Sequence, residues 1–362
     1  MIHKEYWFWL SNLPGIGIKK INELLTYFHD PESIYEAKEE SLRKVLKLSK
    51  RDIEQVLSNI NRYKIQENYA KLNERGIYFV TKDENEYPEK LRSLWDAPIA
   101  LYIKGELPKE RVCTIAIIGA RNCSAYGKEM ASYYARELAK AGVQIISGLA
   151  RGIDGYAHQG ALMGKGLTFG VLGCGINICY PREHTNLYHE VIKNGGMISE
   201  YGLGVEPRPG LFPMRNRIIS GLSDGILVIE AKEKSGSLIT TDMGLDQGKD
   251  IFALPGRVTD ALSYGCNNLI KMGAEVVMKP SDILDYYQIN YKENVNEMKK
   301  NNNLLETEEK IVYARLSLEP KHINSIMIET GLNINQLMEI LISLELNNFI
   351  KQTVKNYYTI LV

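Results

Sequence analysis

The sequence lacks an excess of either charge, a set of paired cysteines and any long apolar run. Its 44 lysines and arginines balance 44 aspartates and glutamates, so any nucleic-acid site must be a local patch. Its five cysteines form no C-x-x-C pair, and this odd number argues against a disulfide framework and favours reduced thiols in the cytoplasm. The apolar run near the start, MIHKEYWFWLSNLPG, is too short for a signal peptide. We therefore expect a cytoplasmic protein with no membrane span.

The dinucleotide fingerprint G-x-G-x-x-G is also missing where a first strand meets a helix. Residues 115–118 are an apolar run typical of a buried parallel strand, and they are followed by Gly119, Arg121 and then Gly127. Free N–H groups at a helix N-terminus attract anions, and arginine can grip phosphate oxygens in a bidentate way. The turn therefore predicts a phosphate site without NAD. The alternative is a structural turn with a surface arginine.

Strand and helix patterns alternate through residues 112–287, which predicts an α/β domain with an extended Rossmann-like parallel sheet. Of the 30 glycines, 26 lie between residues 105 and 280, where they suit a close approach of backbone to ligand. We expect strands at residues 115–118, 143–147, 168–172, 197–199, 226–230, 251–254 and 275–278.

Cations, glycines and a serine follow several of these strands. Because the carboxyl ends of parallel strands share one edge, we expect these residues to form a groove for an anionic ligand. A polynucleotide backbone needs many such contacts, whereas a single nucleotide needs one or two. The candidate DNA- or phosphate-binding residues are Gly119, Arg121, Arg151, Arg182, Arg215, Arg217, Gly236 and Ser237. For Arg217 the alternative is a structural role that anchors the loop 201–213 to the sheet.

Other polar and aromatic residues of this region favour structural roles. Asp154 and His158 have the i, i+4 spacing of some metal ligands, but a helix cap and a packed histidine explain them more simply. No cluster of carboxylates suits a pair of metal ions, so we expect neither metal nor cofactor. Tyr180 and Phe212 are expected mostly in the core, although Tyr180 could stack on a base.

The two ends of the chain predict smaller domains. Residues 1–75 have helical patterns, and the turn around Gly15 and Gly17 resembles the hairpin of a helix-hairpin-helix or SAM-like domain. Such a turn can offer N–H groups to a DNA phosphate, with Lys19 and Lys20 beside it; the alternative is a tight turn between helices. The predicted division is 1–75 for this helical domain, 76–287 for the sheet domain, 288–303 for a polar linker and 304–362 for a winged helix.

The winged-helix pattern consists of helices at 306–316, 322–331 and 334–346 and a hairpin of strands at 349–354 and 357–361. Its third helix contains no lysine or arginine, and residues 304–362 hold five of these cations against seven glutamates. A helix that reads the major groove needs cations for phosphates and base edges. The composition therefore favours a protein contact over sequence-specific DNA recognition.

The motifs of the central region resemble the DNA-processing protein A family (DprA, also called Smf) over nearly all of residues 84–286. They are GAR at 119–121, SGLARGID at 147–154, GCG at 173–175 with Tyr180-Pro181, FPMRNRIISGLS at 212–223, SGSLIT at 235–240, LPG at 254–256 and GCNNLI at 265–270. The resemblance implies a protein of natural transformation that binds and protects incoming single-stranded DNA and helps load the recombinase RecA. It also implies a homodimer, and DNA contacts at Gly119, Arg121 and the segment ending at Arg182.

Two further functions stay open beside this non-catalytic hypothesis. Related Rossmann-like domains include N-glycosidases of nucleoside monophosphates, whose catalytic glutamate lies on a helix comparable with residues 236–249. Asp242 and Asp246 are present there, but no glutamate is. The third hypothesis is a small-nucleotide sensor, for which a mononucleotide must bind as tightly as an oligomer.

Overall fold

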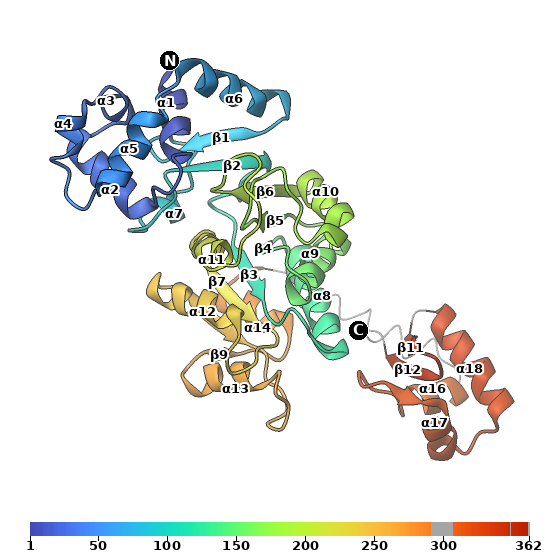
Figure 1. The fold of residues 1–362 in the computed structure, drawn as a ribbon. Helices are drawn as coiled ribbons and strands as arrows, with labels where there is room; N and C mark the ends of the chain where they lie inside the picture. Colours follow the sequence, from blue (N-terminus) through green and yellow to red (C-terminus); the bar gives the residue numbers. More distant parts are fainter. Residues whose placement is uncertain (291–306, 348, 361–362) are drawn as a thin grey trace.

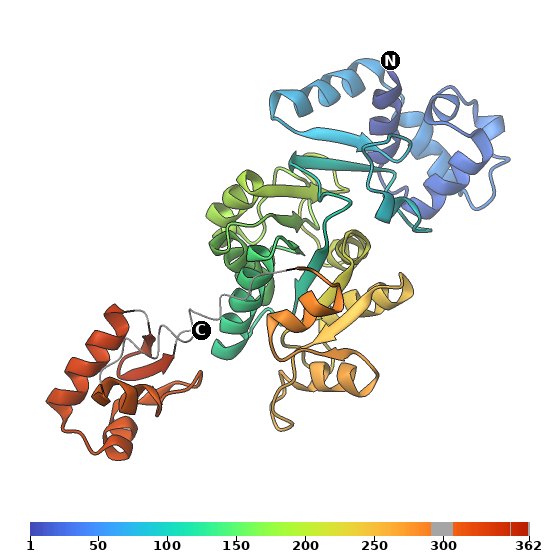
Figure 2. The ribbon, with the colours of Figure 1, turned by 180° about the vertical axis from the view of Figure 1, so that it is seen from behind.

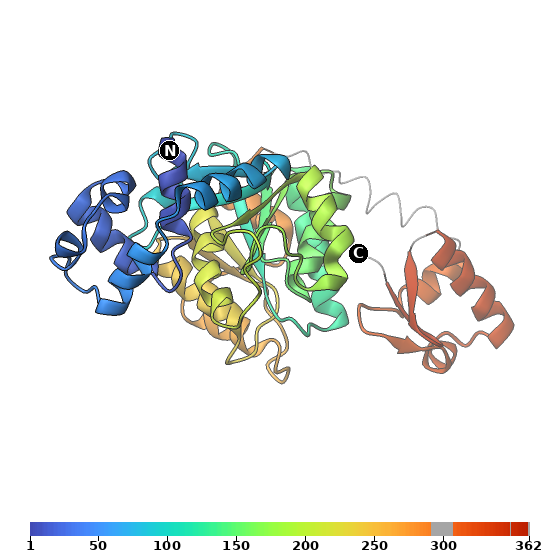
Figure 3. The ribbon, with the colours of Figure 1, turned by 45° about the horizontal axis from the view of Figure 1, so that its top comes forward.

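The computed structural model describes residues 1–290, 307–347 and 349–360, which form a helical region, a central sheet domain and a winged helix (Figure 1). The helical region is confirmed. It consists of α1 (His3–Ser11), α2 (Ile18–Phe28), α3 (Pro31–Tyr35), α4 (Glu39–Leu42), α5 (Lys50–Ser58) and α6 (Arg62–Glu74). Its core continues past residue 75, because Leu10 and Leu24 belong to the same buried cluster as Phe79 and Tyr102. The helices therefore pack directly on one end of the sheet (Figure 3).

The two lysines beside the predicted hairpin turn make contacts within the protein. Lys20 Nζ lies 2.7 Å from Asp52 Oδ1 of α5, and Lys19 Nζ lies 5.6 Å from the centre of the Trp95 ring. A DNA contact by either lysine stays a prediction.

Within the described residues, nine strands form the central sheet in the order β1-β2-β6-β5-β4-β3-β7-β8-β9. All seven predicted strands are confirmed, and they pair in parallel from β6 to β9. The antiparallel strands β1 and β2 extend this sheet beyond β6, and neither is among the seven strands predicted from the sequence. The strands are β1 (Tyr78–Thr81), β2 (Ala100–Gly105), β3 (Thr114–Ile118), β4 (Gln144–Ser147), β5 (Thr168–Val171), β6 (Gly195–Ser199), β7 (Gly225–Val228), β8 (Asp250–Ala253) and β9 (Glu275–Val276).

Helices cover both faces of the sheet because its central strands are apolar on both sides. Ile115 and Ile117 of β3 belong to the core under α8 (Ala125–Lys140), α9 (Ile153–Met163) and α14 (Pro280–Tyr286). Ala116 and Ile118 belong to the opposite core under α7 (Glu89–Arg92), α11 (Leu211–Leu222) and α13 (Tyr264–Lys271). Seen from behind, the green α8–α10 and the yellow α11–α12 flank the sheet (Figure 2). The remaining elements are η1 (Arg182–His184), α10 (Thr185–Lys193) and α12 (Gly236–Asp246).

The C-terminal domain has the predicted winged-helix order, and Leu337, Leu341 and Leu344 of α18 belong to its core. Ion pairs join it to the sheet domain between Lys351 and Glu129 and between Arg257 and Glu319. Its elements are α16 (Thr307–Tyr313), β10 (Lys321–His322), α17 (Ile323–Thr330), α18 (Ile334–Leu346), β11 (Ile350–Val354) and β12 (Tyr357–Ile360). From residue 291 onward the predicted linker lies outside the described residues. None of the described helices is both long and apolar enough to cross a membrane.

Candidate functional site

Two neighbouring cavities open where β3 lies between β4 and β7, the point at which the strand order reverses direction. Ligands of open α/β sheets bind at such switch points. The larger cavity, of about 500 Å³, is lined by residues that include Gly119, Arg121, Ala150, Asp154, Tyr180, Phe212, Arg215, Gly236 and Ser237. The smaller, of about 400 Å³, is lined by Arg121, Asn122, Cys123, Lys128, Arg151, Gly152, Gly155, Tyr156, Gln159, Glu183 and His184. Arg121 lines both, so the cavities adjoin at its side chain.

The turn that carries Arg121 is fixed by Glu230, which follows β7. The Glu230 carboxylate accepts a hydrogen bond from the Ser124 N–H at 2.9 Å, and its backbone oxygen accepts one from the Ala120 N–H at 2.7 Å. Gly119 lines the larger cavity, but a Cβ there would lie 2.6 Å from the Ile153 side chain. Close packing against Ile153 of α9 is therefore by itself a reason for glycine at position 119, and the approach of an anion to this glycine stays a prediction.

Arg121 lies beside two aromatic rings. Its guanidinium lies 5.5 Å from the centre of the Phe212 ring, and that ring centre lies 5.5 Å from the centre of Tyr180. Tyr180 is 45 % exposed and Phe212 is half-buried, so the expectation that both lie mostly in the core is wrong. The cation can contact a phosphate, and the rings offer flat surfaces on which bases can stack.

Arg217 does not belong to the predicted set of phosphate contacts. It lies on α11, is 2 % exposed, and forms an ion pair with Glu200; its Nε lies 3.6 Å from Asp96 Oδ2. Neither cavity is lined by Arg217. A buried guanidinium already paired with carboxylates cannot be offered to a ligand, so Arg217 has a structural role. Its hydrogen bonds and ion pairs join α11 to Asp96 and Glu200, and not the loop 201–213 to the sheet as the alternative stated.

Arg215 forms part of the floor of the larger cavity rather than its rim. It is 4 % exposed, and its Nη1 donates a hydrogen bond to the Val171 carbonyl. Its guanidinium occupies the space above Gly148, where a Cβ would lie 2.0 Å from Nη1. Burial lowers the pKa of Arg215, and the Asp154 carboxyl opposes this shift. Arg215 can reach a ligand only at the bottom of the cavity.

Asp154 and His158 have structural surroundings, although Asp154 is not the helix cap that the sequence suggested. The N-cap of α9 is Gly152, and Asp154 Oδ2 accepts a hydrogen bond from the Gly148 N–H at 3.2 Å. Burial raises the pKa of Asp154, and the charge of Arg215 opposes this shift. His158 is fully buried, with Nδ1 2.7 Å from Thr168 Oγ1. Within the described residues, no group of three or more histidine, cysteine or acidic side chains could hold a metal.

His158 is expected to make the stability of the fold depend on pH. Burial lowers its pKa to about 3, from 6.5 for a free histidine. The unfolded chain therefore binds a proton at His158 more tightly than the folded chain does. The contribution of neutral His158 to the free energy of unfolding is complete above pH 6.5 and is lost as the pH falls toward 3. Lowering the pH from 7 to 5 should cost about 2 kcal/mol. Urea unfolding at both pH values measures this cost, which His158→Gln should remove and His189→Gln, at an exposed site, should retain. An equal loss in all three proteins contradicts the assignment.

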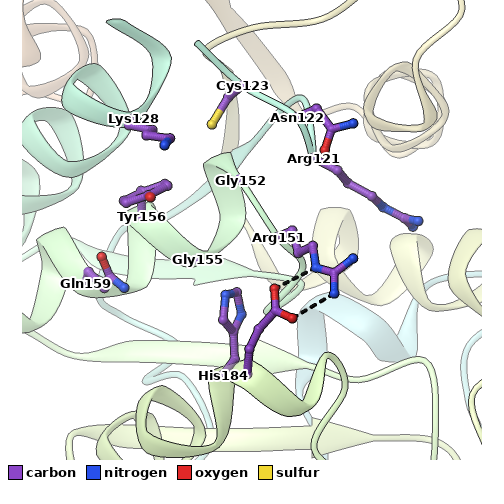
Figure 4. Close-up of a pocket in the computed structure, with 11 residues that line it drawn as sticks. Arg121, Asn122, Cys123, Lys128, Arg151, Gly152, Gly155, Tyr156, Gln159 and His184 are labelled. Carbon is purple, nitrogen blue, oxygen red and sulfur yellow. Dashed lines mark hydrogen bonds and ion pairs between the residues drawn. The ribbon is translucent and has the colours of Figure 1, made fainter. Parts of the chain in front are cut away.

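The other predicted residues lie at the surface. Arg151 lines the smaller cavity and forms two hydrogen bonds with Glu183, at 2.6 and 2.7 Å (Figure 4). This pairing raises the pKa of Arg151 and lowers that of Glu183. Arg182 is exposed at the start of η1 and lines neither cavity. Gly236 and Ser237 line the larger cavity at the N-terminus of α12, as the strand-edge argument predicted.

Sequence reasoning missed Lys128 and Tyr156, which line the smaller cavity from the first turns of α8 and α9. These helices begin just after β3 and β4, so their first turns lie at the same edge as the strand ends. A search of the first turn of each helix that follows a strand, in addition to the loop between them, could have found these two residues in the sequence.

The architecture defines an extended Rossmann-type α/β protein with a winged-helix domain and two adjoining cavities, lined by cations and aromatic rings, at its switch point. The chain belongs to the DNA recombination-mediator protein A family, whose model matches residues 78–288. A second family model, the DprA winged helix domain, matches residues 298–354. The family predicted from the motifs is thereby confirmed.

Named relatives and solved structures agree with this assignment. The chain is 42 % identical over 228 residues to protein Smf of Escherichia coli (strain K12), covering 63 % of this chain and 61 % of that protein. It is 41 % identical over 219 residues to the DNA processing protein DprA of Bacillus subtilis, covering 60 % of this chain and 73 % of the relative. The crystal structure of DprA from Streptococcus pneumoniae matches with a TM-score of 0.69 at 30 % identity, covering 81 % of this chain and all of that one. A Helicobacter pylori DNA processing protein A, described for its single-stranded DNA binding mode, matches with a TM-score of 0.53 at 30 % identity, covering 60 % of this chain and 97 % of that one.

Proposed function

We propose that this protein binds single-stranded DNA in the groove formed by the two cavities. The observation that carries the proposal is the position of Arg121, which lines both cavities and lies 5.5 Å from the Phe212 ring. A cation beside two aromatic rings suits a strand whose bases are unpaired, because each nucleotide then presents a phosphate and a free base face. The Helicobacter pylori relative, described for its single-stranded DNA binding mode, supports this ligand.

The wider role that we propose is in natural transformation. The protein would protect incoming single-stranded DNA and help load RecA onto it, acting in the cytoplasm as a homodimer. The family description as a recombination mediator and the names of the Bacillus and Streptococcus relatives support this role. The matched region covers about three fifths of the Escherichia coli relative. RecA, the dimer and the cytoplasmic location therefore all belong to the proposal.

We propose that the protein has no catalytic activity of its own. Asp242 and Asp246 of α12 are exposed and line neither cavity, so they are not placed like a catalytic glutamate. Asp154 is the carboxyl group in the larger cavity, and it is buried against Arg215 and the Gly148 N–H. This arrangement favours a structural carboxyl over an N-glycosidase. Release of free base from a nucleoside monophosphate would instead support the enzyme.

The proposal predicts tight, salt-sensitive binding to single strands. Fluorescence anisotropy with labelled oligo-dT, a matched duplex and dTMP over a salt series measures it. The oligomer should bind more tightly than the duplex and dTMP, with a log–log salt slope of about −0.7 for each neutralised phosphate. Equal affinity for dTMP would favour a small-nucleotide sensor, and no preference over duplex would contradict the proposal.

A further inference from the structure

The smaller cavity contains a second pair of a cation and an aromatic ring. Lys128 Nζ lies 5.6 Å from the centre of the Tyr156 ring, much as Arg121 lies 5.5 Å from the centre of Phe212. In the view of Figure 4, Lys128 and Tyr156 lie together on the left of the cavity, and Arg121 and Arg151 lie on its right. Each of the two adjoining cavities therefore combines a cation with a flat ring.

The charge of the smaller cavity also favours a phosphate. Its charged lining consists of Arg121, Lys128 and Arg151 against the single acid Glu183. Glu183 already forms two hydrogen bonds with Arg151, so Lys128 and Arg121 are the cations left to an incoming anion. The polar side chains of Asn122, Gln159 and His184 complete the wall and offer hydrogen bonds to a base or sugar.

We propose that the smaller cavity is a second nucleotide subsite, which holds a neighbouring nucleotide of the same DNA strand. The inference rests on the proposed function, and it extends the DNA-binding site from the larger cavity across Arg121 into the smaller one. Lys128 contacts the phosphate of this nucleotide, and Tyr156 provides the surface on which its base stacks. Arg121, shared by the two cavities, contacts the phosphate between the two nucleotides.

In this subsite the Glu183 carboxylate competes with a DNA phosphate for the guanidinium of Arg151. The Glu183 carboxylate occupies the Arg151 fork in the way that a phosphate would. Both side chains are largely exposed, at 61 % and 52 %, so the pair is weak and a DNA phosphate can replace the carboxylate. Removing the carboxylate should therefore strengthen DNA binding at this subsite.

The test compares variants across a length series of oligo-dT, from dTMP to about 16 nucleotides. Lys128→Gln and Tyr156→Ala should each lower the affinity for the longer oligomers about fivefold or more. The affinity for the shortest oligomers that bind should stay unchanged. Tyr156→Phe keeps the ring and should bind like wild type. Glu183→Gln should tighten binding of the longer oligomers by up to about fivefold, a gain that misfolding cannot produce.

Matched controls separate this subsite from general charge effects. Lys165→Gln removes an exposed lysine just beyond the C-terminal end of α9, and Glu190→Gln removes a surface carboxylate paired with Lys193; neither residue lines either of the two cavities. The subsite is refuted if Lys128→Gln and Glu183→Gln bind long oligomers like wild type while Arg121→Ala does not, a result that leaves the proposed function intact. Equal losses at every length, dTMP included, would instead assign the cavity to a free nucleotide. If the unaltered protein has no preference for single strands, the proposed function itself fails.

Discussion

Arg121→Ala is expected to lower the affinity for oligo-dT by about tenfold or more at moderate salt. Arg121 is exposed, lines both cavities, and comes from a turn that Glu230 fixes. Hydrogen bonds from a charged donor to phosphate contribute about 1.5–3 kcal/mol each. Because one side chain serves both cavities, its loss should weaken binding more than the loss of any other single rim residue. Anisotropy with labelled oligo-dT measures the change.

The matched control is Arg111→Ala. Arg111 is also exposed, but it precedes β3 and so lies at the opposite edge of the sheet. Arg111→Ala removes the same charge from the segment before β3 and should leave the affinity for oligo-dT nearly unchanged. Arg121→Lys should recover only part of the binding, because lysine lacks the planar fork of arginine. Wild-type affinity in Arg121→Ala would show that the DNA site lies elsewhere.

Arg217→Ala is expected to destabilise the sheet domain by about 3–5 kcal/mol, with no direct effect on the groove. Arg217 is 2 % exposed, and its partner Glu200 is 13 % exposed. Removing the guanidinium leaves the Glu200 carboxylate buried without its cation, which costs more than the pair itself contributes. It also removes the hydrogen bond that Arg217 Nη1 donates to the Asp96 carbonyl, a link between α11 and the segment before β2. Urea unfolding of the wild type and of Arg217→Ala at neutral pH measures the loss in the free energy of unfolding.

The double variant Arg217→Met with Glu200→Gln tests whether the unpaired charge causes this loss. It removes both charges and should recover a large part of the lost stability. Arg121→Ala, which changes an exposed side chain, should unfold at nearly the same urea concentration as wild type. A loss below about 1 kcal/mol in Arg217→Ala would mean that the ion pair is dispensable.

The pair Arg215 and Arg217 shows where sequence reasoning reached its limit. Both residues were expected to bind an anionic ligand at the sheet edge, but both lie on α11, where they are 4 % and 2 % exposed. A sequence gives the order of residues and their apolar periodicity, but it does not give the direction in which a polar side chain points. Here the partners of Arg217 lie 121 and 17 residues away, at Asp96 and Glu200.

The sequence by itself determined the alternation of strands and helices, the winged-helix order, the family and the strand ends at which the two cavities open. These features depend on local apolar patterns and on motifs within short stretches, so they can be recognised before the chain is folded. The tertiary structure alone decided which cations are free to bind. It buried Arg217 against Glu200, placed Arg121 between two cavities and brought Lys128 to Tyr156. The physical reason is that burial and pairing arise from contacts between distant segments, and these contacts determine whether a charge is available to a ligand.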